Sequence, residues 1–196
     1  MNIVKDKKIA IVGGGPGGLT LARLLQLKSA DVKVYERDAN KDVRVQGATL
    51  DLHEESGLKA LREAGLIEAF KKNYRPGADL IRIIDKDANI LFDEHEAPIS
   101  NKTFEEAAFR PEIDRGPLRK ILLDSLVPGT VIWDSHFSSM KKINDQWELA
   151  FKNGTTATAD IVIAADGANS KIRPYITSVA PFYTGLQPLK AQCIML

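Results

Sequence analysis

The stretch Lys8-Ile-Ala-Ile-Val-Gly-Gly-Gly-Pro-Gly-Gly18 decides the fold class of this chain. Its first five residues form a short apolar run rich in β-branched side chains, which is typical of a buried parallel strand. The glycines that follow satisfy the pattern G-x-G-x-x-G at Gly13, Gly15 and Gly18. The first glycine of that pattern allows a tight turn, the second lets the backbone approach a pyrophosphate, and the third lets helix and strand pack closely. The stretch therefore predicts the first turn of a dinucleotide-binding fold.

The residues on the far side of the turn complete a β-α-β unit. Apolar residues recur at helical spacing over 16–28, and Pro16 lies in the first turn, where its missing N–H costs nothing. The run 32–36 alternates as a second strand and ends at Glu36, whose carboxylate can accept both hydroxyls of an adenosine ribose and repels a 2′-phosphate. A structural glycine turn beside a solvated strand end is the alternative. Because strand, turn, helix and acid are in register, we favour dinucleotide binding.

The middle of the chain carries a second helical pattern and a hairpin pattern. Apolar residues recur at helical spacing over 54–70, and Gly65 is expected to divide that helix, as a glycine beyond a helix C-terminus does. The runs 80–85 and 90–92 flank polar residues and predict a β-hairpin. The acidic stretch 93–112 is interpreted either as a loop or as an edge of a second sheet.

The second half of the chain predicts another helix and a series of strands. Asp114 is expected to cap a helix that reaches Leu126. Trp133 and Trp147 fall within expected strands and are interpreted as core residues rather than as stacking platforms. A fully apolar run at 161–165 predicts a further buried strand. Short antiparallel strands are expected at 130–133, 138–143, 147–151 and 155–158.

The composition excludes several classes of function. The net charge is +1, from 27 basic and 26 acidic residues, so neither nucleic acid nor an anionic membrane is an expected partner. Cys193 is the single cysteine, and the scattered His53, His95 and His136 lack metal-ligand spacing, so no disulfide and no metal site are expected. The polar N-terminus lacks the features of a signal peptide, and no apolar run reaches about 18 residues. These features predict a cytoplasmic protein.

Motifs beyond the glycine turn distinguish FAD from NAD, which share the ADP half. They are Glu36-Arg37, Arg44, Arg115-x-x-Leu118-Arg119 and Asp166-Gly167-Ala-Asn-Ser170-Lys-Ile-Arg173. Together they resemble the aromatic-ring hydroxylase family of FAD-dependent monooxygenases, and the resemblance covers almost all of residues 7–185. The stretch Gly47-Ala-Thr-Leu-Asp-Leu-His53 further looks like the branch that includes the tetracycline-inactivating monooxygenases, with Ala48 where that branch has a glycine.

The resemblance implies a role for each of these positions. Glu36 would hold the adenosine ribose, Arg37 would lie along the adenine or the nearby phosphate, and Arg115 would contact the flavin side of FAD. Asp166 would lie near the pyrophosphate, where family members also use it toward the reduced pyridine nucleotide. The segment with Arg44 and Asp51 would approach the isoalloxazine. The candidate cofactor-binding residues are therefore Gly13, Gly15, Gly18, Glu36, Arg37, Arg44, Asp51, Arg115 and Asp166.

Each of the weaker candidates has a structural alternative. Arg115 and Arg119 are four residues apart on the expected helix, so both could lie on a solvated face. Asp166 and its following glycine could be only a turn after a buried strand. Asp51 and His53 alternate with leucines, as on the outer face of an ordinary strand.

The resemblance also implies an architecture and a reaction. We expect an α/β fold: a Rossmann-like FAD-binding domain over 1–75 and 106–180, with part of a β-sheet substrate domain over 76–105 and 181–196. In the implied reaction NAD(P)H reduces FAD, and one oxygen atom of O2 is transferred to a small organic substrate, with tetracycline-like polycyclic compounds as candidates. The flavin performs this chemistry, so no catalytic side chain is assigned. A monomer is expected.

The C-terminal end departs from the family pattern. A complete family member is about twice this length and carries a Gly-Asp motif in its second half, whereas no Gly-Asp pair occurs in these 196 residues. We therefore expect a truncated chain. Two alternatives to an active monooxygenase stay open: an inactive remnant or nucleotide-binding module, and an NAD-dependent dehydrogenase built on the same turn.

Overall fold

A parallel sheet forms the centre of the protein. The computed structural model describes residues 4–43, 49–95, 104 and 109–185. Within them, the central sheet has the order β12-β1-β2-β8, and its neighbouring strands all pair in parallel. Its strands are β1 (Lys8–Val12), β2 (Asp31–Tyr35), β8 (Val131–Ile132) and β12 (Ile161–Ala164). The apolar runs at 8–12 and 161–165 are thus confirmed as strands, and they lie side by side.

The expectation of an antiparallel strand at 130–133 is wrong. The chain there forms β8, which pairs in parallel with β2 at the edge of the sheet. The backbone N–H of Val34 donates to the carbonyl of Thr130 and that of Glu36 to the carbonyl of Ile132, each at 2.9 Å. The helix that precedes β8 returns the chain to the end of the sheet at which β2 starts. The two strands can therefore run in parallel, as strands joined through a crossover helix do.

Opposite faces of β1 pack into separate cores, because side chains alternate along a strand. Ile9 and Ile11 belong to a core shared with the helices, whereas Ala10 and Val12 belong to a core shared with the meander. The meander is an antiparallel sheet in the order β11-β10-β9, as expected. Its strands are β9 (Phe137–Ile143), β10 (Gln146–Phe151) and β11 (Thr156–Ala159).

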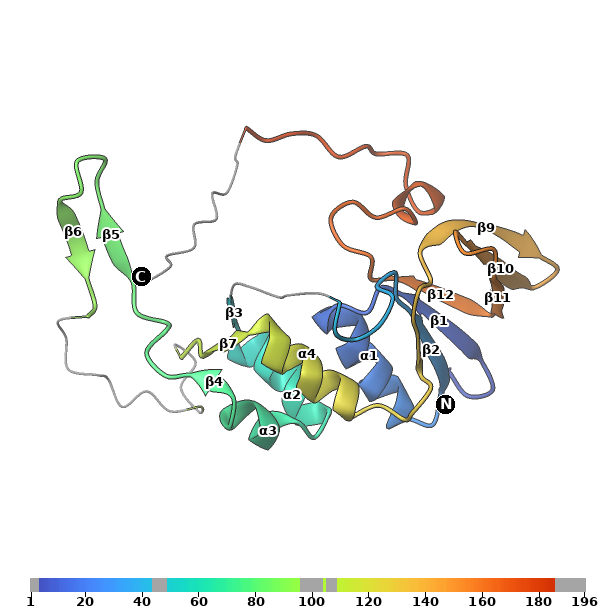
Figure 1. Cartoon of the computed structure of the whole chain (residues 1–196), viewed down its shortest axis with the longest axis horizontal. Coiled ribbons are helices and arrows are strands. Elements are labelled where there is room, and N and C mark those ends of the chain that lie inside the picture. Colours follow the sequence, from blue (N-terminus) through green and yellow to red (C-terminus); the bar gives the residue numbers. More distant parts are fainter. Residues whose placement is uncertain (1–3, 44–48, 96–103, 105–108, 186–196) are drawn as a thin grey trace.

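The helices cover the other face of the central sheet (Figure 1). Helix α1 (Pro16–Gln26) buries Leu19 and Ala22, and α4 (Arg115–Asp124) packs beside it. Asp114 stands at the N-cap of α4 but makes no capping side-chain hydrogen bond; its carboxylate is instead 3.4 Å from Arg75. The helical pattern over 54–70 is confirmed, with a break at Gly65, whose φ is +72°. Its segments are a π-helical turn (Glu54–Leu58), α2 (Lys59–Glu63) and α3 (Ile67–Lys71).

A small antiparallel sheet, in the order β3-β7-β4, lies at the N-terminal end of α4, because β7 leads directly into that helix. Its strands are β3 (Thr49–Asp51), β4 (Tyr74–Arg75) and β7 (Glu112–Asp114). The stretch 93–112 therefore leads into the central strand of this sheet. Tyr74 packs edge-on against Phe104 and Phe109, with ring centroids 5.1 and 6.3 Å away, and this aromatic group stabilises the sheet.

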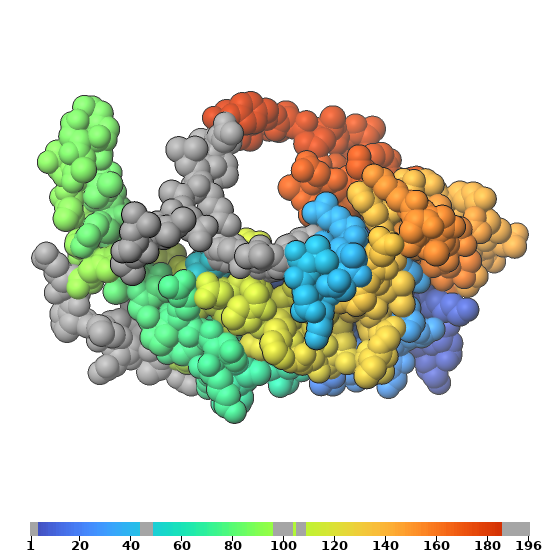
Figure 2. Space-filling view, viewed as in Figure 1, coloured from blue at the N-terminus to red at the C-terminus, as the bar shows by residue number. Residues whose placement is uncertain are grey.

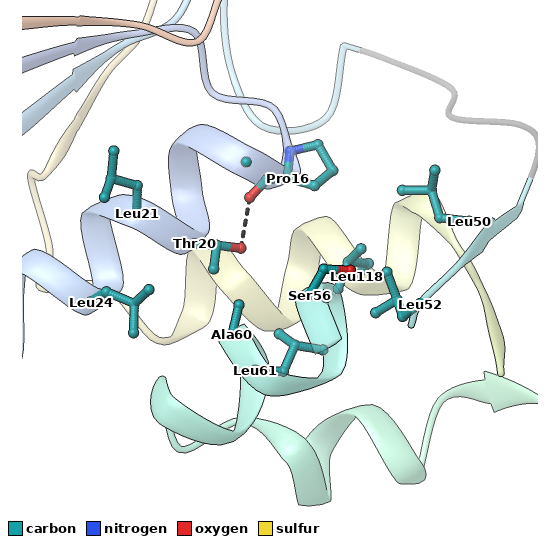
Figure 3. A pocket seen from close by; sticks show the side chains of 12 residues that line it. Pro16, Thr20, Leu21, Leu24, Leu50, Leu52, Ser56, Ala60, Leu61 and Leu118 are labelled. Carbon is teal, nitrogen blue, oxygen red and sulfur yellow. Dashed lines mark hydrogen bonds between the residues drawn. The ribbon is translucent and has the colours of Figure 1, made fainter. Parts of the chain in front are cut away.

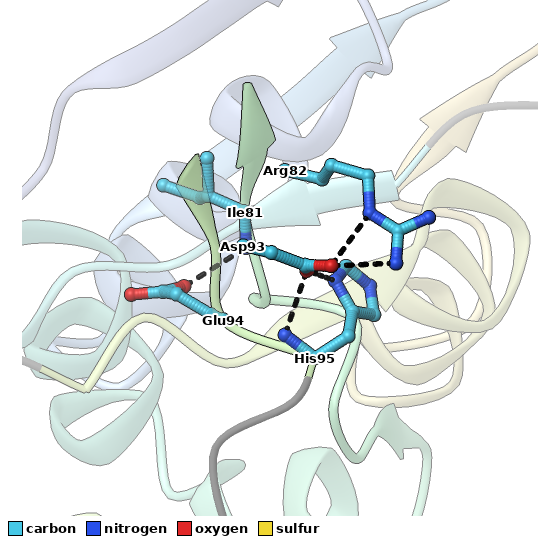
Figure 4. Close-up of polar contacts among 5 residues, drawn as sticks. All are labelled: Ile81, Arg82, Asp93, Glu94 and His95. Atoms are coloured by element: carbon cyan, nitrogen blue, oxygen red, sulfur yellow. Dashed lines mark hydrogen bonds and ion pairs between the residues drawn. The ribbon is translucent and has the colours of Figure 1, made fainter. Parts of the chain in front are cut away.

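The expected hairpin is present and projects from the body (Figures 1 and 2). It consists of β5 (Arg82–Ile84) and β6 (Ile90–Asp93). At its base the Asp93 carboxylate accepts hydrogen bonds from the Arg82 guanidinium at 2.7 Å and from the backbone N–H of His95 at 2.9 Å (Figure 4). These bonds hold the pKa of Asp93 well below its usual range, Arg82 being the largest cause. Along the described ranges, no helix is both long and apolar enough to cross a membrane.

Candidate functional site

The glycine turn lies where the C-terminal ends of three strands meet. Gly13 follows β1, and its N–H donates to the carbonyl of Tyr35 at the end of β2, at 2.9 Å. Its φ is +113°, and a Cβ placed on it would be 2.2 Å from the carbonyl oxygen of Ala165, just after β12. A side chain is therefore excluded at Gly13 by both conformation and space. Ligands of open parallel sheets bind at this edge.

Gly18 and Gly15 serve different purposes in the turn. A Cβ on Gly18 would be 2.1 Å from the carbonyl oxygen of Gly13, so this glycine permits the close packing of α1 on the turn. A Cβ on Gly15, by contrast, would meet no described atom within 4 Å. Gly15 is the N-cap of α1, and no described side chain caps that helix end. The backbone at Gly15 is therefore open to a ligand, and the helix N-terminus favours an anion there.

Glu36 is joined directly to the glycine turn. It is only 4% exposed, and its Oε2 accepts a 2.5 Å hydrogen bond from the N–H of Gly14. Its Oε1 accepts a second bond from the N–H of Asp38 at 3.0 Å. A carboxylate offers about four lone-pair sites, so these bonds are compatible with further donors from sugar hydroxyls. Sequence reasoning missed Gly14, where an added Cβ would be 2.9 Å from the Oε2 of Glu36 and would displace that side chain.

Asp166 lies on the other side of Gly13. The Cβ position of Gly13 is 2.9 Å from the Asp166 backbone nitrogen. The Oδ2 of Asp166 accepts a 2.7 Å bond from the N–H of Lys171, which closes a turn through Gly167 at a φ of +86°. Its Oδ1 is buried and has no hydrogen-bond partner among the described residues. Asp166 is thus both a turn residue and a neighbour of the glycine turn, and it has a buried acceptor without a described partner.

Positive charge surrounds the end of β2. Arg37 is exposed, directly after Glu36. Partial burial lowers the pKa of His136, and the charges of Lys152, Arg37 and Lys171 lower it further. These cations are therefore near His136, and one of them, Arg37, directly follows Glu36.

A second group of predicted residues lies at the β3–β7 sheet. Asp51 on β3 pairs in register with Glu112 of β7, and Thr49 pairs with Asp114, directly before Arg115. Arg115 is exposed at the first position of α4. Asp51 is also exposed and lies 3.0 Å from His53, which agrees with an outer strand face. Arg44 lies outside the described residues.

An apolar cavity of about 400 Å³ lies between α1, the segment from Leu50 to Leu61, and α4 (Figure 3). Its lining includes Pro16 and Gly17 at the start of α1, and Leu50 and Leu52 of the β3 region. Thr20, Leu21, Leu24, Ser56, Gly57, Ala60, Leu61 and Leu118 complete its lining. The structure therefore brings the N-terminus of α1 and the β3 segment to one cavity, although they are distant in sequence.

Arg119 is not on a solvated face, in contrast to its alternative interpretation from the sequence. The residue is 4% exposed, and its Nη2 lies 3.2 Å from the Oδ2 of Asp38. The guanidinium stands over the ring of Trp133, 5.4 Å from the centroid. Trp133 is half-buried, so it contributes to packing and also makes a cation–π contact with Arg119.

Known proteins match the chain over most of its length. A family model described as an FAD binding domain matches residues 6–181. The monooxygenase asqM of Emericella nidulans is 34% identical, covering 92% of this chain and 43% of that protein. The monooxygenase penA of Penicillium thymicola is 30% identical, covering 95% of this chain and 44% of that protein. The crystal structure of the tetracycline destructase Tet(55) is 27% identical with a TM-score of 0.68, covering 88% of this chain and 41% of that one.

These matches confirm the resemblance and the Rossmann-like α/β fold expected from the sequence. They also show that the chain spans less than half the length of the curated relatives that it matches.

Proposed function

Because the chain belongs to the FAD binding domain family, whose matched relatives are monooxygenases, we propose that it binds FAD with the ADP half on the glycine turn. The observation that carries this proposal is the pairing of Glu36 with the turn. A buried carboxylate, oriented by the N–H of Gly14 at 2.5 Å, stands beside a helix N-terminus that is open at Gly15. Hydroxyls and phosphates are the groups that such an acceptor and such a helix end bind.

In this proposal Glu36 binds the ribose hydroxyls and α1 binds the pyrophosphate. A hydrogen bond to a charged group contributes about 1.5–3 kcal/mol, so Glu36 supplies a large share of the affinity for the adenosine half. Arg37 lies along the adenine or the adjoining phosphate. The buried Oδ1 of Asp166 accepts a bond from a hydroxyl or N–H of a bound nucleotide, which is a reason for this atom to lack a partner within the protein.

The flavin half is proposed to extend toward β3 and the start of α4. Leu50 and Leu52 line the same cavity as Pro16 and Gly17 at the start of α1, so an apolar ring system has a surface to contact there. Arg115 at the start of α4 supplies positive charge to the flavin side. Asp51 and Arg44 are kept as candidates on the same segment.

Bound FAD supplies the redox chemistry, with NAD(P)H as the reductant, O2 as the oxidant and an organic molecule as the acceptor of one oxygen atom. The residues of the chain hold and orient the cofactor and keep water from its apolar side. The destructase match makes tetracycline-like polycyclic compounds candidate substrates, and this substrate class would imply a role in antibiotic resistance.

The division into domains follows the same proposal. The FAD-binding domain comprises 1–75 and 106–180, and 76–105 with 181–196 belong to a substrate-covering domain. The hairpin supports this division, because it stands away from the body and exposes apolar side chains on both strands, among them Ile83 at 49% and Leu91 at 67%. Such surfaces are normally covered by further protein or by ligand.

A nucleotide-binding module without catalysis is the second candidate. The chain covers only 43% of its relative from Emericella nidulans, so residues beyond this span contribute to that protein. Purified chain mixed with FAD and either NADH or NADPH distinguishes the candidates. Bound flavin with nucleotide oxidation and an oxygenated product supports the monooxygenase. Bound flavin without oxidation supports the module, and a protein that binds no flavin contradicts both.

A further inference from the structure

A buried ion pair lies next to the proposed ribose site. The side chains of Arg119 and Asp38 are 5% and 10% exposed, and their Nη2 and Oδ2 atoms are 3.2 Å apart. Arg119 comes from α4, whereas Asp38 follows β2, so the pair joins segments that are 81 residues apart. Removing Asp38 would leave the buried guanidinium of Arg119 without this ion-pair partner.

The arginine is held incompletely by the protein. Its Nε and Nη1 are buried and have no hydrogen-bond partner among the described residues. The ring of Trp133 covers the guanidinium at 5.4 Å and compensates part of the cost of burying it. A pair buried in this way contributes little net stability compared with apolar side chains of similar volume. The burial of this pair is therefore weak evidence for a stabilising role.

The contacts of Asp38 lead directly to Glu36. The N–H of Asp38 donates to the Oε1 of Glu36 at 3.0 Å, and the carbonyl of Asp38 accepts from the N–H of Asp134 at 2.8 Å. The other oxygen of Glu36 is held by Gly14 at 2.5 Å. Arg119 thus fixes Asp38, Asp38 fixes one oxygen of the Glu36 carboxylate, and the glycine turn fixes the other.

We propose that Arg119 is a positioning residue which, through Asp38, sets the orientation of the Glu36 carboxylate and so the selectivity of the site for a ribose with both hydroxyls. This inference rests on the proposed role of Glu36 in ribose binding. An acceptor that is rotated loses the angle of its hydrogen bond to a hydroxyl, and hydrogen bonds weaken steeply with angle. The phosphates, which bind at α1, are unaffected by that rotation.

The test compares ADP with 2′-deoxy-ADP as calorimetric ligands of the purified chain. We expect the unaltered protein to prefer ADP by roughly tenfold or more, the equivalent of one hydrogen bond to a charged group. Arg119→Met keeps the apolar stem and removes the donors, and we expect its preference to fall below about threefold through weaker ADP binding. Arg119→Lys retains the charge and restores part of the preference. Arg62→Met is the matched control, because this exposed arginine of α2 pairs with Glu54 of the preceding turn, and it keeps the full preference.

The outcomes separate this inference from the function on which it rests. If Glu36→Gln abolishes the preference for ADP and Arg119→Met retains it, Glu36 binds the ribose and Arg119 has no positioning role. If Glu36→Gln also retains it, the ribose role of Glu36 is wrong and the inference fails with it. Equal weakening of both ligands by Arg119→Met would indicate a purely structural role and overturn the inference. Asp38→Asn, which preserves side-chain volume, is expected to reduce the preference as Arg119→Met does, and full retention would also contradict the proposal.

Discussion

The backbone N–H of Gly14 donates a 2.5 Å hydrogen bond to the Oε2 of Glu36, which joins the glycine turn to the acid at the end of β2. The two residues are 22 positions apart, and the bond is buried. The turn and the acid are therefore one preorganised unit. A ligand that bridges them does not have to order the carboxylate first, and this lowers the entropic cost of binding.

Replacing the acid tests its contribution to affinity. Glu36→Gln retains the shape of the side chain and removes its charge, so we expect the affinity for ADP to fall by about tenfold to a hundredfold. Calorimetric titration measures this change. Glu68→Gln, at an exposed glutamate on α3, is the control and should bind as the unaltered chain does. An unchanged affinity in Glu36→Gln would exclude a ribose role for this residue.

The glycines of the turn are expected to separate stability from binding. A Cβ on Gly15 meets no described atom within 4 Å, so Gly15→Ala should cost about 1 kcal/mol or less, as a change at an N-cap. It should nevertheless weaken ADP binding at least about tenfold, because the methyl group occupies the approach of the pyrophosphate. Thermal unfolding and titration of the same sample measure both effects.

Gly18→Ala is the matched contrast. Its Cβ would be 2.1 Å from a backbone oxygen, so the helix must shift and the free energy of unfolding should fall by about 1–3 kcal/mol or more. If Gly15→Ala lowered the free energy of unfolding as much as Gly18→Ala, this result would contradict the open space next to Gly15.

Arg115 should distinguish the two halves of the cofactor. We expect Arg115→Met to weaken FAD binding by about tenfold and to leave ADP binding unchanged, because α4 begins near β3 rather than near Glu36. Lys120→Met removes an exposed charge further along the same helix, whose partner is Asp124, and should change neither affinity. Equal loss for both ligands in Arg115→Met would place this arginine at the ADP half instead.

His136 should make stability depend on pH. Burial and the neighbouring cations lower its pKa in the folded protein, so the unfolded chain, with an ordinary pKa near about 6.5, binds its proton more readily. The free energy of unfolding should therefore decrease as the pH drops through about 6.5 toward the lower pKa that His136 has in the folded protein. Above about pH 6.5 this contribution to stability should be fully retained. The decrease in Tm between neutral and mildly acidic buffer should be smaller in His136→Gln. A larger decrease in that variant would contradict a lowered pKa of His136 in the folded protein.

The sequence was sufficient where spacing alone defines geometry. The glycine spacing, the helical period after Pro16 and the alternation before Glu36 are local, and the structure confirms the β-α-β unit that they predict. The hairpin around 86–89 was equally local. The direction of β8 could not be predicted from local spacing, because side chains alternate in the same way along parallel and antiparallel strands.

The surroundings of the candidate residues were less accessible to sequence reasoning. Arg119 has helical spacing typical of an exposed face, and only the loop after β2 brings Asp38 against it. The unpartnered oxygen of Asp166 depends in the same way on contacts between distant segments. The roles of these residues in ligand binding stay predictions until they are measured.

Competition for bound FAD shows whether the glycine turn and Glu36 hold the ADP half of the cofactor. FAD is added to the purified chain, and its fluorescence is followed while ADP or flavin mononucleotide is titrated in. We expect saturable FAD binding that ADP displaces and that flavin mononucleotide displaces much less, because these residues contact the ADP half. Displacement by flavin mononucleotide but not by ADP, or no binding of FAD at all, would contradict it.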